Sequence, residues 1–149
     1  MKQEFLQVNG LKVFTRIAGK GKPFLILHGW GGNGDRWLSA MNLLKNNFQV
    51  MAIDLPGFGK SEAPQSTWGL DDYAEFITNV ADTLNWEKFY LLGHSFGGRI
   101  AIKLAIKRPQ KIEKLILVGA AGLKHKFNLK TIFGKTLLFI YKKFPLFPK

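Results

Sequence analysis

Apolar and polar residues alternate along residues 4–19, and Asn9-Gly10 interrupts the alternation near its middle. Strict alternation is typical of a strand with one buried face. An Asn-Gly pair favours a two-residue hairpin turn between two such strands. The pattern therefore predicts an antiparallel hairpin near the N-terminus.

Short, mostly apolar runs follow the hairpin and alternate with stretches of helical periodicity. The runs predicted as buried strands are 23–27, 48–55, 89–92 and 115–118. Between them, apolar residues recur at helical spacing at Trp37, Met41 and Leu44, along 71–84 and along 100–106. Strands that alternate with helices indicate an α/β fold with a mostly parallel sheet.

The pattern changes after Gly119-Ala120-Ala121-Gly122, which closes the last predicted strand. Residues 123–149 interleave aromatic and aliphatic side chains with lysines. We therefore divide the chain into a core, residues 1–122, and a separate segment, residues 123–149.

Length and composition narrow the class of protein. With 149 residues, 46% of them hydrophobic, the chain is long enough for one domain with a substantial core. It has no cysteine, which excludes disulfides and cysteine nucleophiles. No run approaches the roughly 20 apolar residues of a membrane-spanning helix, and the polar start at Met1–Glu4 is unlike a signal peptide. A cytoplasmic protein is expected.

The formal net charge of +12 is unevenly distributed. Residues 1–98 contain nine basic and nine acidic side chains, whereas residues 99–149 contain 13 basic side chains and Glu113 as their only acid. We interpret the excess as a solvated helix face followed by a basic tail, because no nucleic-acid-binding motif accompanies it. No nucleic-acid partner is expected.

The stretch LILHGWGGNGDRW, residues 25–37, supports two hypotheses. Gly29, Gly31 and Gly34 have the G-x-G-x-x-G spacing of a dinucleotide-binding loop, and Asp54 lies 20 residues beyond Gly34. Alternatively, an apolar strand that ends in His-Gly can supply a backbone N–H to an oxyanion hole. The preceding hairpin favours the second hypothesis, and so does Trp30, which would lie where the first needs close approach to a pyrophosphate.

A second motif, Gly93-His94-Ser95-Phe96-Gly97, matches G-x-S-x-G between a predicted strand and a predicted helix. Flanking glycines permit the tight turn that raises a serine hydroxyl above the edge of the sheet. In that turn the backbone N–H of Phe96 faces a developing oxyanion. The motif and its context predict that Ser95 is a nucleophile.

Together these motifs resemble the α/β-hydrolase superfamily, in its serine branch of carboxylesterases and carbon–carbon bond hydrolases. The resemblance covers about residues 5–122 and rests on LHGWGG at 27–32, DLPGFGKS at 54–61 and GHSFGG at 93–98. It implies the α/β-hydrolase fold, Ser95 as nucleophile and an oxyanion hole formed by the N–H groups of Trp30 and Phe96. It also implies that neither a cofactor nor a metal is needed.

The residues around these groups are assigned supporting roles. His28, Gly29 and Gly31 belong to the loop beside the site, where His28 is expected to orient the loop by hydrogen bonding. His94 is expected to pack beside Ser95. Asp54 is expected to fix the turn at Pro56-Gly57. The aspartate nucleophile of dehalogenases and epoxide hydrolases is absent at position 95, which argues against those reactions.

The triad acid and histidine of this family follow the serine along the chain. After Ser95 the only acid is Glu113, which starts a predicted strand and so lies at the far end of the sheet. The only histidine is His125, where the family's cap begins. We therefore expect no triad acid and no triad histidine in this chain, and a sheet truncated before the last two strands of the family fold.

The leading hypothesis is a serine hydrolase that cleaves an ester, a thioester or a similar acyl bond of a small molecule through an acyl-enzyme. Without a base the chain alone is expected to be nearly inactive, and a complementing C-terminal half is its expected partner. The alternatives are a non-catalytic fragment or one half of a split assembly, and, less favoured, a dinucleotide-binding oxidoreductase domain.

Residues 123–149 are expected to start a cap that folds over Ser95. The apolar and basic side chains of this segment also permit contact with an anionic membrane surface. We favour the cap, because Pro145 and Pro148 limit the length of any helix there.

Overall fold

A computed structural model describes residues 1–122 of the chain. The elements, in chain order, are β1 (Lys2–Val8), β2 (Leu11–Ala18), β3 (Lys22–Leu27), η1 (Gly34–Trp37), α1 (Leu38–Leu44), β4 (Phe48–Ile53), α2 (Leu70–Thr83), β5 (Phe89–His94), α3 (Phe96–Lys107), η2 (Pro109–Lys111) and β6 (Ile112–Val118). The predicted cap segment, residues 123–149, lies outside the described residues, and so does His125.

The predicted N-terminal hairpin is formed by β1 and β2, in which Val8 pairs with Leu11 across the turn. Asn9 and Gly10 have φ angles of 47° and 80°. Both values lie in the left-handed region that a type I′ turn requires, and glycine and asparagine tolerate it best. β2 in turn pairs antiparallel with β4 and so joins the hairpin to the rest of the sheet.

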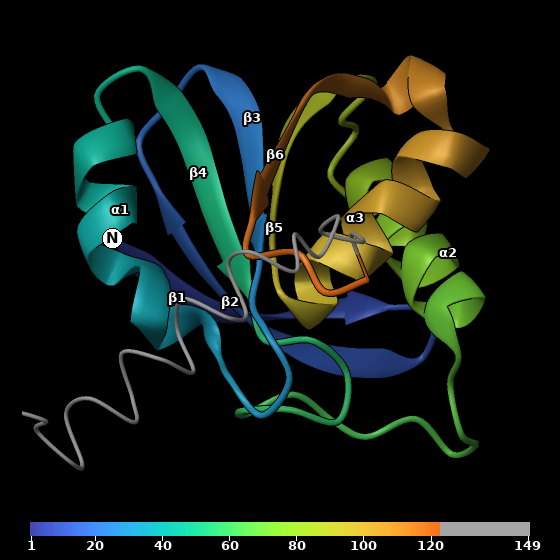
Figure 1. Ribbon diagram of the computed structural model, residues 1–149. Helices are drawn as coiled ribbons and strands as arrows, with labels where there is room; N and C mark the ends of the chain where they lie inside the picture. The colour runs from blue at the N-terminus through green and yellow to red at the C-terminus, as the bar shows by residue number, and fades with distance from the viewer. Residues whose placement is uncertain (123–149) are drawn as a thin grey trace, which may run out of the picture.

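The six strands form one sheet in the order β1-β2-β4-β3-β5-β6 (Figure 1). β4, β3, β5 and β6 run parallel to one another. The prediction of a mostly parallel sheet with an antiparallel hairpin is thus confirmed. Because parallel strands end at the same edge of a sheet, His28, Asp54 and Ser95, which follow β3, β4 and β5, gather there.

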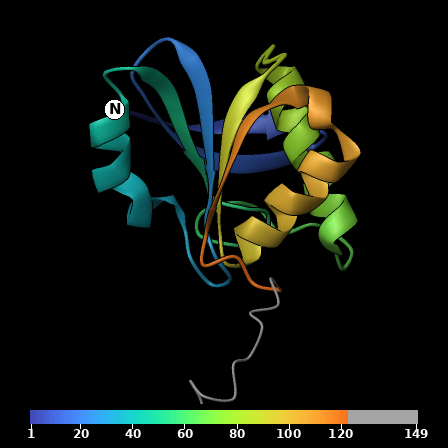
Figure 2. The same ribbon diagram turned by 45° about the horizontal axis from the view of Figure 1, so that its top comes forward.

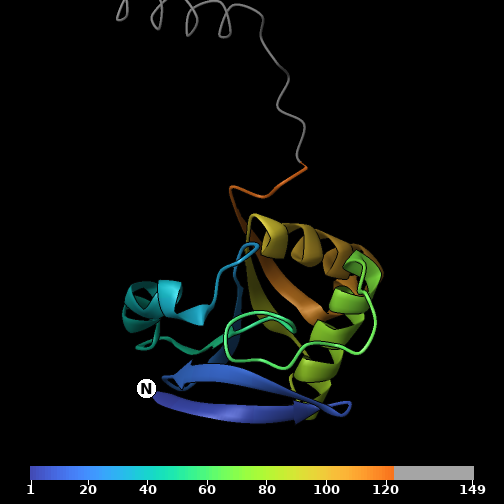
Figure 3. The same ribbon diagram turned by 90° about the horizontal axis from the view of Figure 1, so that it is seen from below.

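Helices cover both faces of the sheet, with α2 and α3 on one face and α1 on the other (Figures 1 and 2). Seen from below, the β1–β2 hairpin runs along one side of the molecule, with α1 and the α2–α3 pair at either end of it (Figure 3). Side chains of successive residues in β3 lie on opposite faces of the sheet. Leu25 and Leu27 pack with α2 and α3, whereas Phe24 and Ile26 pack with α1. This explains why the predicted strands show no regular alternation of apolar and polar residues.

Several predicted boundaries are wrong by a few residues. β4 ends at Ile53 instead of residue 55, and β6 begins at Ile112 instead of residue 115. α3 begins at Phe96 instead of residue 100, because Gly97 and Gly98 carry no side chain that could extend the apolar pattern. Among residues 1–122 no helix has both the length and the hydropathy needed to cross a bilayer.

Candidate active site

Ser95 forms the tight turn between β5 and α3, with φ 50° and ψ −109°. A positive φ at a residue other than glycine stores about 1–3 kcal/mol of strain, and such residues cluster at functional sites. The end of β6 holds the turn in place. The N–H of Ser95 donates to the carbonyl of Val118 (3.1 Å), and the carbonyl of Ser95 accepts from the N–H of Ala121 (3.2 Å).

The glycines around Ser95 are required by close packing against the backbone and, at Gly98, against the side chain of Ala120. A Cβ atom on Gly93 would lie 2.5 Å from the carbonyl oxygen of Gly97, and one on Gly97 would lie 2.5 Å from that of Leu27. A Cβ atom on Gly98 would lie 2.6 Å from the Cβ atom of Ala120. No larger residue fits at these three positions without displacing the chain.

Residues 29–32 form a second turn, which packs against Ser95. The N–H of Gly32 donates to the carbonyl of Gly29 (3.0 Å), and Gly31 has a φ of 65°. A Cβ atom on Gly29 would lie 3.2 Å from the Cβ atom of Ser95. The carbonyl of His28 accepts from the N–H of Gly97 (3.1 Å), which fastens this turn to the start of α3.

Two backbone donors flank Ser95 in these turns. Neither the N–H of Trp30 nor that of Phe96 donates a hydrogen bond to another residue of 1–122. Phe96 is the first residue of α3, where the backbone N–H groups have no partner within the helix and the helix dipole is positive. Both N–H groups are therefore without a hydrogen-bond partner among residues 1–122.

His28 holds the 29–32 turn through both ring nitrogens. The N–H of Leu55 donates to Nε2 (2.9 Å), so the ring hydrogen is assigned to Nδ1, which donates to the carbonyl of Gly29 (2.8 Å). Burial lowers the pKa of His28 below its ordinary value, which favours this neutral form. The carbonyl of Gly29 belongs to the same peptide unit as the N–H of Trp30, so the bond fixes the direction of that N–H.

Asp54 is fully buried beneath the same loops. Its hydrogen bonds extend beyond the turn at Pro56-Gly57, which it is expected to fix. Its Oδ1 accepts from Arg16 Nη1 (2.6 Å) and from the N–H of Gly34 (2.7 Å). Its Oδ2 accepts from the N–H of Lys60 (2.9 Å). Since these bonds occupy both Gly34 and Asp54, neither is available to a pyrophosphate or a ribose, and the dinucleotide-binding alternative fails.

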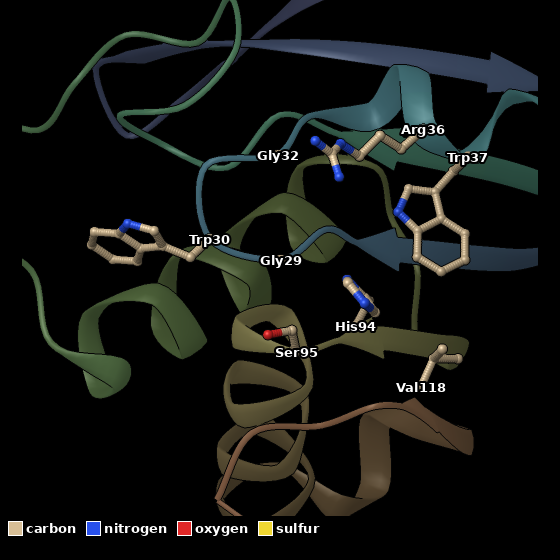
Figure 4. A pocket seen from close by; sticks show the side chains of 8 residues that line it. All are labelled: Gly29, Trp30, Gly32, Arg36, Trp37, His94, Ser95 and Val118. Carbon is tan, nitrogen blue, oxygen red and sulfur yellow. The ribbon is translucent and has the colours of Figure 1, made fainter. Parts of the chain in front are cut away.

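A pocket of about 340 Å³ opens beside Ser95 (Figure 4). Its lining comes from four loops or elements: Gly29, Trp30, Gly32, Arg36, Trp37, His94, Ser95 and Val118. The sequence motifs predicted five of these positions, directly or as part of the 29–32 turn, but not Arg36, Trp37 or Val118. Trp37 was assigned only to a helix, and nothing in the sequence pattern distinguishes Arg36 from a surface arginine.

Trp30 is 74% exposed, and its ring lies edge-on to the rings of Phe58 and Phe96, with centroids 5.0 and 5.2 Å away. Phe96 also contacts Tyr73, at 5.3 Å between centroids, and does not line the pocket. The ring of Phe96 therefore packs against its aromatic neighbours outside the pocket, whereas its backbone N–H lies next to Ser95.

The remaining titratable groups lie apart from Ser95 or form no hydrogen bond with it. Glu113 follows Ile112, which pairs with Phe89 at the start of β5, so it is at the opposite end of the sheet as predicted. His94 lies in the pocket with its ring 6.0 Å from that of Trp37. Within residues 1–122 no three histidine or acidic side chains are placed to hold a metal ion.

Comparisons with known proteins agree with this fold. A family model described as alpha/beta hydrolase fold matches residues 22–148. The 2-hydroxymuconate semialdehyde hydrolase of Pseudomonas sp. is 35% identical over 118 residues, which cover 76% of this chain and 42% of that protein. An uncharacterised protein of Mycobacterium tuberculosis is 35% identical over 126 residues, covering 85% of this chain and 37% of that protein.

Among solved structures, that of a membrane phospholipase A, described as a bacterial virulence factor, superposes with a TM-score of 0.81 at 28% identity. The match covers 99% of this chain and 54% of that one. The chain thus spans about a third to two fifths of the length of the curated relatives it matches.

Proposed function

Because the chain belongs to the alpha/beta hydrolase fold family, we propose that it carries the nucleophile half of a serine hydrolase. The reaction is cleavage of an ester, a thioester or a similar acyl bond through an acyl-enzyme. The observation that carries the proposal is the backbone of Ser95, held at φ 50° between β5 and α3 beside an open pocket. A strained residue in this position exposes its side chain at the sheet edge.

In this proposal Ser95 Oγ loses its proton to a base from outside residues 1–122 and bonds to the carbonyl carbon, and the carbonyl oxygen takes the negative charge. Collapse of this intermediate breaks the bond to the alcohol or thiol, which leaves with that proton, and the acyl group stays on Oγ. The N–H groups of Trp30 and Phe96 donate to the carbonyl oxygen. Donors that are fixed before the reaction stabilise the developing charge without reorganisation, and loss of one such donor typically lowers kcat by about 10²–10³. His28 contributes by holding the Gly29 carbonyl, and with it the N–H of Trp30.

A serine hydroxyl is a weak nucleophile without a neighbouring base. His28 cannot serve, because both of its ring nitrogens are occupied by Leu55 and Gly29. His94 makes no hydrogen bond with Ser95 within the described part of the chain, and Glu113 is at the other end of the sheet. We therefore propose that the triad acid and histidine come from sequence outside residues 1–122, and that the chain alone reacts slowly.

Covalent labelling tests the nucleophile independently of turnover. A fluorophosphonate is incubated with the 149-residue chain, and adducts are located by mass spectrometry. We expect one adduct, on Ser95, that is absent from Ser95→Ala and unchanged in Ser39→Ala, where an exposed serine of α1 is removed. Equal labelling of Ser95→Ala, or no adduct on Ser95 after prolonged exposure, would contradict the proposal.

A second candidate, a non-catalytic half of an assembly, is favoured by the outer edge of β6. This strand pairs with β5 alone among the described strands, and its Leu115, Ile116 and Val118 side chains are exposed. Exposed apolar strand edges pair with other chains. Size-exclusion chromatography should show association that Ile116→Lys weakens and Ile106→Lys, on α3, does not. A monomer at all concentrations would count against this candidate.

A further inference from the structure

The pocket beside Ser95 contains one charged side chain among its lining residues, that of Arg36. Arg36 lies in η1, next to Trp37, and in Figure 4 its guanidinium lies beside Gly32, while Ser95 and Val118 line the other side of the same pocket. No aspartate or glutamate lines the pocket. A ligand in contact with Ser95 is therefore within a cavity whose fixed charge is positive.

The positive charge of Arg36 is not neutralised by its neighbours in the described part of the chain. Its guanidinium forms no ion pair there, although the adjacent residue is Asp35. The carboxylate of Asp35 is instead turned to Arg16, with 2.6 Å between Oδ1 and Nε. Arg16 thus pairs with the carboxylate that is adjacent to Arg36 in the sequence.

The pocket walls away from Arg36 limit the size and polarity of a ligand that binds there. Trp37 is half-buried and its ring lies edge-on to His94, while Val118 supplies an aliphatic wall. The volume of about 340 Å³ is at the small end for ligand pockets, which typically hold about 300–1,000 Å³. The pocket suits a short apolar group between the reacting carbonyl and the cation.

We propose that Arg36 is a specificity-determining residue, and that the substrate carries a carboxylate on the side of the scissile bond that enters this pocket. The guanidinium presents two parallel N–H donors, which match the two oxygens of a carboxylate. The inference deepens the proposed function and rests on it, because it takes Ser95 as the point of attack.

Binding of a matched ligand pair tests this assignment without requiring turnover. Monomethyl glutarate carries the carboxylate, and dimethyl glutarate is its neutral counterpart. Both are titrated into the 149-residue chain while the indole N–H signal of Trp37, identified with Trp37→Phe, is followed by NMR. We expect the anionic ester to bind about tenfold more tightly, as a charge-assisted hydrogen bond provides, and the preference to fall as salt is added.

Substitutions then test whether Arg36 causes the preference for the anionic ester. Arg36→Gln should remove it, and Arg36→Lys should retain part of it, because lysine keeps the charge but not the paired donors. Arg108→Gln, at the far end of α3, removes the same charge outside the pocket and should leave the preference unchanged. Equal binding of the two esters to the unsubstituted chain, or an unchanged preference in Arg36→Gln, would overturn the proposal.

Two further sets of titrations distinguish a carboxylate site from a phosphate site, and the anionic subsite from the serine chemistry. Methyl phosphate that binds more tightly than monomethyl glutarate would overturn the assignment of a carboxylate in favour of a phosphate. The same titrations in Ser95→Ala should give the same anion preference. If that preference is present while fluorophosphonate fails to label Ser95, the anionic subsite stands and the proposed serine chemistry falls.

Discussion

Arg16 and Asp54 form an ion pair of 2.6 Å in which both side chains are completely shielded from solvent. The pair joins β2 to the end of β4, and through Gly34 and Lys60 it also fastens the two loops that lie beneath the site. A charge that is buried with its partner is tolerated, whereas the same charge left alone is costly.

Replacement of Arg16 by methionine should therefore lower the free energy of unfolding by about 3–5 kcal/mol, because Asp54 keeps its charge but loses its cation. Urea denaturation followed by circular dichroism measures the change. Lys111→Met provides the control: it breaks the Lys111–Asp82 pair, in which the Asp82 side chain is 55% exposed, and should cost less than about 1 kcal/mol. Similar losses in both variants would show that burial of the pair is unimportant.

Protonation of His28 should destabilise the fold. Burial lowers its pKa below the ordinary value of 6.5, so the unfolded chain binds this proton more readily than the folded chain. The stabilisation is fully present above about pH 6.5 and is lost as the pH falls towards the lowered pKa of the folded state. Denaturation curves between about pH 5 and pH 7.5 should show the free energy of unfolding decreasing towards acid.

His28→Asn should weaken this dependence on pH, although it also removes hydrogen bonds and lowers stability at every pH. His94→Asn is the control for the loss of an imidazole near the site. In this variant the free energy of unfolding should still decrease towards acid pH. If His28→Asn follows the unsubstituted chain in parallel across the whole range, His28 is not the group responsible.

The backbone strain at Ser95 predicts an unusual order of stability. Glycine adopts a positive φ freely and alanine does not, so Ser95→Gly should be more stable than Ser95→Ala by about 1 kcal/mol. At Ser39, within α1, the order should reverse, because glycine in a helix is less stable than alanine by about 0.5–1 kcal/mol. Thermal unfolding of the four variants gives both differences. The same order at both positions would contradict the conformation of Ser95.

The contact between α3 and the end of β3 leaves no room for a methyl group at Gly97. A Cβ atom there would lie 2.5 and 2.6 Å from the carbonyl oxygens of Leu27 and His28. Gly97→Ala should cost at least about 2 kcal/mol, because backbone atoms cannot move aside as a side chain can. Gly69→Ala is the control, since its nearest neighbour would be 3.7 Å away, and should cost less than about 1 kcal/mol. A tolerated Gly97→Ala would mean that the turn at Ser95 is looser than described.

The local pattern of the sequence determined the elements and the position of the turn at Ser95. Alternation predicted the hairpin around Asn9-Gly10, and short, mostly apolar runs predicted the parallel strands, because burial on one or both faces of a sheet determines which consecutive residues are apolar. The G-x-S-x-G motif located the serine, because glycines on either side of it permit the tight turn between a strand and the helix that follows directly.

Only the tertiary structure decided which distant residues meet. Arg16 and Asp54 are 38 positions apart, and no periodicity relates two residues that come together because β2 pairs with β4. The same holds for the pocket, where η1 contributes Arg36 and the end of β6 contributes Val118. Their proximity depends on the order of the strands in the sheet, which follows from packing between elements and not from the preference of any one segment.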